Sequence, residues 1–132
     1  MRTRVLGVLW LAVAIGCGGP FLMFPGGSLS GEVVSDPPAS WSFVDSRFMD
    51  LEVRPADPYS VTINYFVVDG LLYIDPEPDR VWSQYLVEDD RVRARFGFDD
   101  RVYLLRAVLV SPAGEPFMDF DPARMVYRLE AR

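Results

Sequence analysis

Two absences limit the chemistry that the side chains of this 132-residue chain can carry out. The chain contains no histidine, and all thirteen of its basic residues are arginine. Without imidazole, a Ser-His-Asp or Cys-His nucleophile system and an ordinary protein zinc site are excluded. Without lysine, Schiff-base chemistry and a Walker-type phosphate loop are excluded as well. If the protein is an enzyme, a bound cofactor must therefore carry its chemistry.

The single cysteine, Cys17, lies in the hydrophobic segment at the start of the chain. It follows Ala14-Ile15-Gly16, a run that fits a lipobox, so lipid attachment after cleavage is one interpretation of Cys17. The other is a small apolar residue in a membrane-spanning helix, because the segment continues to Phe24 and is then about twenty residues long. A cleaved signal peptide with a freely secreted product is a third alternative. With one cysteine, no intrachain disulfide can form.

The same segment predicts where the protein is located. Residues 1–24 are expected to be a transmembrane helix or a lipoprotein signal peptide, and Arg2 and Arg4 are the only charges in it. Because positive residues stay on the cytoplasmic side, the C-terminal domain is expected on the extracytoplasmic side of the membrane. Residues 25–40 are rich in Gly, Ser and Pro and are predicted to be a tether, followed by one domain at 41–132.

The charge of the chain excludes one class of partner. The net charge is −6 and the arginines form no basic cluster, whereas nucleic acid binding needs concentrated positive charge on one surface. Nucleic acid is therefore not an expected partner. The acidic pairs at 99–100 and at 119 and 121 do not match the spacing of an EF-hand loop, so no metal site is predicted.

The strongest local signal for the fold is a β-hairpin at residues 59–74. Two β-rich runs, 59–68 and 71–74, are joined by Asp69-Gly70, and this dipeptide tolerates the positive φ angles of a type I′ turn. Both faces of the first run carry apolar residues, which suits a closed or nearly closed sheet. Alternating or apolar runs predict further strands at 41–44, 48–54, 91–96, 101–110 and 125–129.

One helix is predicted between the hairpin and the next strand, over residues 79–87. The acidic turn 75–79 suits its N-terminal end, and the spacing of Trp82, Tyr85 and Leu86 places them on one face. For Trp82, a place in the core is favoured over a contact with a cofactor. Together these elements predict a mainly β protein, a small barrel of six to seven antiparallel strands with one short helix, behind an N-terminal hydrophobic membrane segment.

Four arginines on the predicted strands leave alternatives open. Arg91, Arg93 and Arg95 share one strand face and could form a phosphate stripe, but a solvated sheet face opposite acidic residues of neighbouring strands is the favoured interpretation. Arg106 interrupts an apolar strand. It either pairs with a buried carboxylate or faces the mouth of the barrel.

Several short motifs together resemble a known superfamily. They are Gly31-Glu32-Val33-Val34-Ser35, Trp41-Ser42-Phe43, Ser60-Val61-Thr62, Asp69-Gly70-Leu71-Leu72-Tyr73, Arg80-Val81-Trp82, Asp90-Arg91-Val92-Arg93 and Arg128-Leu129-Glu130. In this order they are similar to the split-barrel flavin-binding superfamily, which includes pyridoxamine phosphate oxidases and deazaflavin-dependent nitroreductases. The run Gly27-Ser28-Leu29-Ser30-Gly31-Glu32 after a hydrophobic segment resembles its uncharacterised membrane-anchored members. The resemblance covers residues 26–132 and implies a split β-barrel.

The resemblance also implies an activity and a site. It implies a flavin- or deazaflavin-dependent oxidoreductase that binds FMN or a deazaflavin, transfers hydride to an unknown acceptor and builds its groove at a homodimer interface. The cofactor-binding residues that it implies are Arg54, Ser60, Thr62 and Arg80, with Trp82 and Gln84 as lesser candidates. Arg forks and hydroxyls are suitable partners for a phosphate.

The acidic turn at residues 75–79 favours an alternative function. Its three carboxylates would repel a phosphate by an amount comparable to one good ion pair. Export without a twin-arginine signal would also leave the protein to acquire a flavin outside the cytoplasm. The alternative is a cofactor-free exported module with a binding or structural role at the cell envelope.

Overall fold

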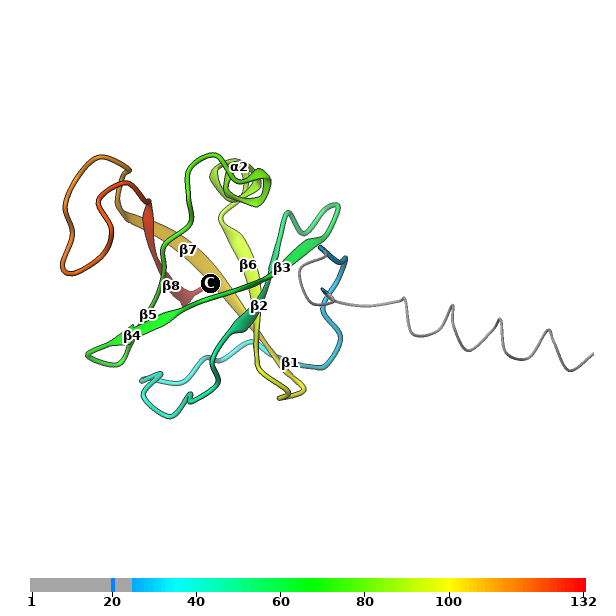
Figure 1. Ribbon diagram of the computed structural model, residues 1–132. Helices are drawn as coiled ribbons and strands as arrows, with labels where there is room; N and C mark the ends of the chain where they lie inside the picture. The colour runs from blue at the N-terminus through cyan, green and yellow to red at the C-terminus, as the bar shows by residue number, and fades with distance from the viewer. Residues whose placement is uncertain (1–19, 21–24) are drawn as a thin grey trace, which may run out of the picture.

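A mainly β architecture is seen in the computed structural model, which describes residue 20 and residues 25–132 (Figure 1). Seven strands form a curled antiparallel half-barrel in the order β3-β2-β6-β7-β8-β5-β4. Their bounds are β2 Met49–Val53, β3 Tyr59–Ile63, β4 Phe66–Val68, β5 Leu71–Ile74, β6 Arg91–Phe96, β7 Arg101–Ser111 and β8 Val126–Ala131. A short additional strand, β1 (Glu32–Val34), pairs in parallel with the start of β7. One short helix, α2 (Val81–Glu88), is present among these residues.

The strands that alternation predicted are confirmed to within about two residues. The predicted runs 48–54, 91–96, 101–110 and 125–129 correspond to β2, β6, β7 and β8. In β2 the inward side chains of Met49, Leu51 and Val53 are fully buried. Burial of such apolar surface from several strands at once provides the main driving force for the curled sheet.

The predicted hairpin is confirmed at its turn but not along its first strand. Asp69 and Gly70 have φ angles of 52° and 78°, and they join β4 to β5 in an antiparallel pair. The run 59–68, however, is broken into β3 and β4, which lie at opposite ends of the strand order. The break includes Tyr65, whose ring packs against Phe96 at 5.0 Å between centroids. Since β3 and β4 follow each other in the sequence, the two edges of the sheet are brought together and the sheet curls.

The predicted strand at 41–44 is wrong. This segment is a turn in which the Val44 N–H donates to the Trp41 carbonyl oxygen at 3.1 Å. The Trp41 side chain is buried and its ring contacts Phe96 and Tyr103, with centroids 5.4 Å and 5.0 Å away. A large aromatic residue anchored in the core fixes the turn more strongly than a two-sided strand pattern can.

Residues 25–34 form a strap that crosses the outer face of the sheet. The strap begins beside β3, where Gly26 forms an antiparallel bridge with Ser60, and it ends as β1 beside β7. Between these points Leu29 is buried. This part of the predicted 25–40 tether therefore lies against the sheet. Figure 1 shows the strap in blue.

Helix α2 begins two residues later than predicted. Arg80 takes the N-cap position without a side-chain cap, and the first turn contains no acidic residue. The Ser83 hydroxyl instead donates to the Glu77 carbonyl oxygen at 2.8 Å. The predicted apolar face is confirmed, since Leu86 is buried and Trp82 and Tyr85 pack against the core.

Apart from residue 20, the predicted membrane segment at 1–24 lies outside the described residues, and so does Cys17. Within residue 20 and residues 25–132, no helix combines the length and the apolar character needed to cross a bilayer.

Candidate functional site

A groove of about 710 Å³ lies between β3 and the segment that links β5 to α2. Apolar and charged residues share its two walls. The β3 wall consists of Tyr59, Val61, Thr62, Ile63 and Asn64, the facing wall consists of Asp75, Pro76, Glu77, Arg80, Val81, Trp82 and Arg124, and Pro25 and Phe48 complete the lining. Its volume falls within the range of small-molecule and cofactor sites.

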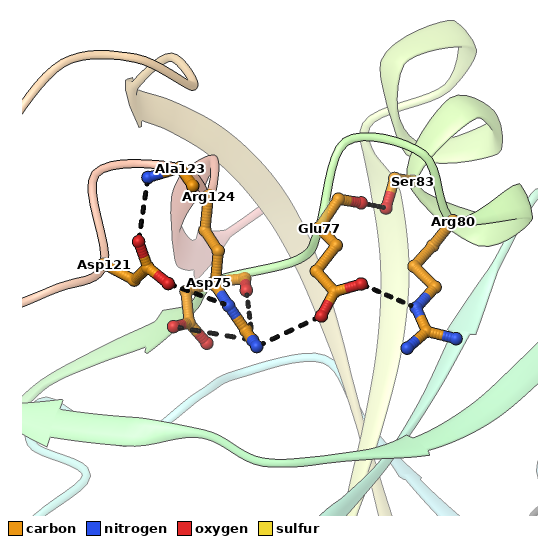
Figure 2. A network of polar contacts seen from close by, with 7 residues as sticks. All are labelled: Asp75, Glu77, Arg80, Ser83, Asp121, Ala123 and Arg124. Carbon is orange, nitrogen blue, oxygen red and sulfur yellow. Dashed lines mark hydrogen bonds and ion pairs between the residues drawn. The ribbon is translucent and has the colours of Figure 1, made fainter.

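The charged residues of the groove form one network (Figure 2). Glu77 stands between two arginines: its Oε2 is 3.3 Å from Arg80 Nε, and its Oε1 accepts a hydrogen bond from Arg124 Nη2 at 3.2 Å. Arg124 also donates to the Asp75 carbonyl oxygen at 3.3 Å and lies 3.9 Å and 4.0 Å from the Asp75 and Asp121 carboxylates. The carboxylates at 75 and 77 are therefore paired.

The carboxyl group of Asp75 in this network titrates with a pKa above its ordinary value. Burial raises its pKa above the usual 3.8, and the positive charge of Arg124 opposes that rise. The effect of burial is the larger one. Desolvation destabilises the charged carboxylate more than the single positive charge of Arg124, 3.9 Å away, stabilises it. Asp75 thus keeps its proton to a higher pH than an exposed carboxylate does.

Three of the six residues implied to bind a cofactor line this groove, namely Thr62, Arg80 and Trp82. Two of the three are already engaged by protein groups. The Thr62 hydroxyl donates to Asp50 Oδ1 at 2.7 Å, and Arg80 is paired with Glu77.

The other three implied residues are not among the groove lining. Arg54 has a φ of 53° and its guanidinium stacks 3.8 Å over the Tyr85 ring. Ser60 is fully buried, and among the described residues its hydroxyl has no hydrogen-bond partner. Gln84 is exposed on α2. The structure therefore does not bring the six residues together.

The prediction that the arginine face of β6 is solvated needs a correction. Arg95 and Arg93 do face carboxylates of β2, with Arg95 Nη2 2.9 Å from Asp50 Oδ2 and Arg93 Nε 3.5 Å from Glu52 Oε2. Asp50 and Glu52 are nevertheless buried, at 8% and 2% exposure. The strap covers them, since the Leu29 N–H donates to Glu52 Oε1 at 2.8 Å.

The two remaining arginines in question lie near the end of α2. Arg91 forms an ion pair with Asp89 at 2.8 Å. Arg106 lies 3.8 Å from Asp90, and both side chains are about half exposed. Its carboxylate partner is therefore exposed, so of the two alternatives left open for Arg106, pairing with a buried carboxylate is not the one seen.

Arg124 is the groove residue that sequence reasoning missed. It lies in the loop between β7 and β8, 47 residues after Glu77, to which it is hydrogen-bonded. Its spacing from Asp121 is a local signal for an ion pair at most, and it carries no information about the groove.

No protein-family model matches the chain, and comparisons with curated proteins and with solved structures also find no match. Within the described part of the chain, no three His, Cys, Asp or Glu side chains are grouped so that they could hold a metal ion.

Proposed function

We propose that this chain is a membrane-anchored split β-barrel protein that carries no flavin. It serves as an exported binding or structural module at the cell envelope, and its groove is the ligand-binding site. The observation that supports this proposal is the position of Glu77 between Arg80 and Arg124. Both groove arginines already have a carboxylate partner, and the charges of Asp75, Glu77, Arg80 and Arg124 sum to zero.

The arrangement does not fit a flavin phosphate. A phosphate dianion would have to displace Glu77 from both arginines, and the Glu77 carboxylate would then remain close to the new negative charge. The Thr62 hydroxyl is committed to Asp50, and neither Arg54 nor Ser60 lines the groove. An uncharged or overall neutral ligand does not meet this repulsion.

A flavin- or deazaflavin-dependent oxidoreductase is the second candidate function. It is favoured by one observation, that Thr62, Arg80 and Trp82 lie in the same groove. In that case the groove would hold FMN or a deazaflavin, and a homodimer would complete it. We propose it as the competing function, and the binding experiment below distinguishes it from the cofactor-free module.

The experiment is a titration of FMN and of a deazaflavin into the full-length protein in detergent, followed by flavin fluorescence. We expect no binding at tens of micromolar by the wild-type protein. The Glu77→Gln variant should gain weak affinity for inorganic phosphate, because it frees both arginines.

Two arginine variants separate the outcomes of this titration. Arg80→Ala is the groove variant, and Arg101→Ala on β7 is the control, because Arg101 is paired with Asp99 away from the groove. Wild-type binding of FMN that Arg80→Ala weakens about tenfold, and Arg101→Ala leaves unchanged, would overturn the proposal in favour of the oxidoreductase.

A further inference from the structure

Four arginines from separate parts of the sequence meet on the outer face of β6 and β7. Arg91 and Arg93 alternate on β6, and Arg91 is the register partner of Arg106 on β7. Like charges directly opposite each other destabilise a sheet, so this face gains from negative charge between them. Arg132, which follows β8, completes the group. We call these four residues the arginine cluster.

Arg132 reaches across β7 to β6. Its Nε donates to the Leu105 carbonyl oxygen and its Nη2 donates to the Val92 carbonyl oxygen, both at 2.9 Å. Val92 and Leu105 are register partners whose side chains are buried in the core, so the guanidinium lies over their backbone on the outer face. The other three arginines are sequence neighbours of these two residues and project from that same face, because side chains alternate along a strand.

Three carboxylates accompany the arginine cluster. The ion pairs are Arg91–Asp89 at 2.8 Å, Arg93–Glu52 at 3.5 Å and Arg106–Asp90 at 3.8 Å. Glu130, the register partner of Arg106, is hydrogen-bonded to Arg128 at 2.7 Å and so is neutralised outside the cluster. Among the described residues Arg132 forms no ion pair, and both of its hydrogen bonds go to carbonyl oxygens. Residues 1–24 contain no aspartate or glutamate, so four guanidinium groups face three carboxylates and one positive charge remains.

Two of the four guanidinium groups can accept a further negative partner. Arg93 is held loosely, since its Nε has no hydrogen-bond partner among the described residues and its side chain is 33% exposed. Arg132 uses two of the five N–H groups of its guanidinium. Burial, and after it the positive charges of Arg93 and Arg91, holds the pKa of Arg132 below its ordinary value, while Asp89 and Glu52 act in the opposite direction. A negative group between Arg93 and Arg132 would reduce that repulsion.

We infer that the arginine cluster binds one small oxyanion, a phosphate or a carboxylate group, between Arg93 and Arg132. Guanidinium forks hold both kinds of group with charge-assisted hydrogen bonds. The three carboxylates around the cluster repel a ligand with several charges, so a single anionic group is favoured over a polyanion. This site goes beyond the proposed function, because none of the four arginines lines the groove.

Inorganic phosphate is the probe for this site. It is titrated with the full-length protein in an uncharged detergent and followed by the width of its phosphorus NMR line. The ionic strength is held constant with sodium chloride, so that screening stays the same. We expect exchange broadening with a Kd of about 1 mM. Displacement by acetate would assign the site to both kinds of group, and no displacement would assign it to phosphate alone.

Three variants test the assignment to the cluster. Arg132→Gln removes the excess charge and should weaken phosphate binding about tenfold, and it leaves no buried carboxylate without its partner. Arg101→Gln is the matched control and should bind like the wild type, because Arg101 lies on the same strand and is paired with Asp99 at 3.6 Å. Asp89→Asn raises the excess to two positive charges and should strengthen binding about threefold.

A groove variant separates this inference from the proposed function. Arg80→Ala should leave phosphate binding unchanged, since Arg80 lies in the groove. Unchanged binding in Arg132→Gln, or no broadening with the wild-type protein at about 10 mM phosphate, overturns the inference. Loss of binding in Arg80→Ala would place the anion in the groove and overturn it as well. The flavin titration at tens of micromolar still decides the proposed function by itself, because a site with a Kd of about 1 mM is almost empty there.

Discussion

Arginine–carboxylate pairs divide into buried and exposed ones, and the two kinds respond differently to substitution. Glu52 is 2% exposed, and it is held by the Leu29 N–H and by Arg93. The Glu77 side chain is 39% exposed, so solvent screens its pairs with Arg80 and Arg124. A pair near solvent contributes little to stability, whereas removal of one partner from a buried pair leaves an uncompensated charge.

Glu52→Gln should therefore destabilise the fold. The amide can still accept the Leu29 N–H, but Arg93 loses the carboxylate beside it, so we expect the free energy of unfolding to fall by about 1–3 kcal/mol. Chemical denaturation followed by tryptophan fluorescence measures the change. Glu77→Gln is the matched control and should lower stability by less than about 1 kcal/mol. Equal losses in the two variants would contradict the role assigned to burial.

Asp75 predicts a specific pH dependence. Burial raises its pKa above 3.8, so the folded state binds the proton more tightly than the unfolded chain. Its contribution to the free energy of unfolding is then largest at low pH and falls as the pH rises from 3.8 through the raised pKa. The stability difference between wild type and Asp75→Asn should decrease across that interval.

Asp89 gives a control of opposite sign for this pH experiment. A side-chain hydrogen bond from Arg91 lowers its pKa below 3.8. Its stabilising contribution is present above 3.8 and is lost as the pH falls through the lowered pKa, so the difference between wild type and Asp89→Asn should increase with pH. If the two stability differences change in the same direction as the pH rises, the assignment at Asp75 is contradicted.

The strap is the element on which the outer face of the sheet depends. It converts Asp50 and Glu52 from surface residues into buried ones, and it pairs with β3 at one end and β7 at the other. Its course requires glycine at position 31, where φ is 150° and an added Cβ would overlap the carbonyl oxygen of Asp100.

Gly31→Ala should release the strap from β7. We expect a loss of more than about 2 kcal/mol, because a strained φ adds to a contact with backbone that cannot rotate away. Hydrogen exchange at residues 26–34 should become faster than in the wild type. Gly27→Ala on the same strap is the control, because the atom nearest to its added Cβ is the Pro58 carbonyl oxygen, 4.0 Å away. Unchanged exchange in Gly31→Ala would show that the strap is held without this contact.

The elements differ in how far the sequence determines them. Strands β2 and β6 could be predicted because their alternation is local and one face is fully apolar. The break after Ile63 could not, because it depends on Tyr65 packing against Phe96, which lies 31 residues further along. The strap and Arg124 were missed for the same reason. Leu29 binds Glu52 and Arg124 binds Glu77 across 23 and 47 residues, and no periodicity reports such contacts.

At the scale of the whole molecule, the strap connects the predicted membrane segment to the groove. Pro25 is the first residue of the strap and lines the groove beside β3. Gly26 then fixes the strap to Ser60 with two backbone hydrogen bonds. Residues 1–24 therefore join the domain next to its candidate site, and an anchored protein would hold that groove close to the membrane surface.

Anchoring itself is tested at Cys17. If Cys17 is lipidated, Cys17→Ala should leave an uncleaved precursor that stays in the membrane fraction through its intact hydrophobic segment, because cleavage requires the modified cysteine. The wild-type protein should then incorporate radiolabelled fatty acid and lose mass on processing. If the segment spans the bilayer instead, blocking lipoprotein processing should leave the mass unchanged and no label should be incorporated.

The hydrophobic run and the two arginines before it predict membrane retention in either case. Recovery of the full-length chain wholly in the cytosolic fraction would contradict both mechanisms, and it would remove the obstacle to flavin loading that export imposes.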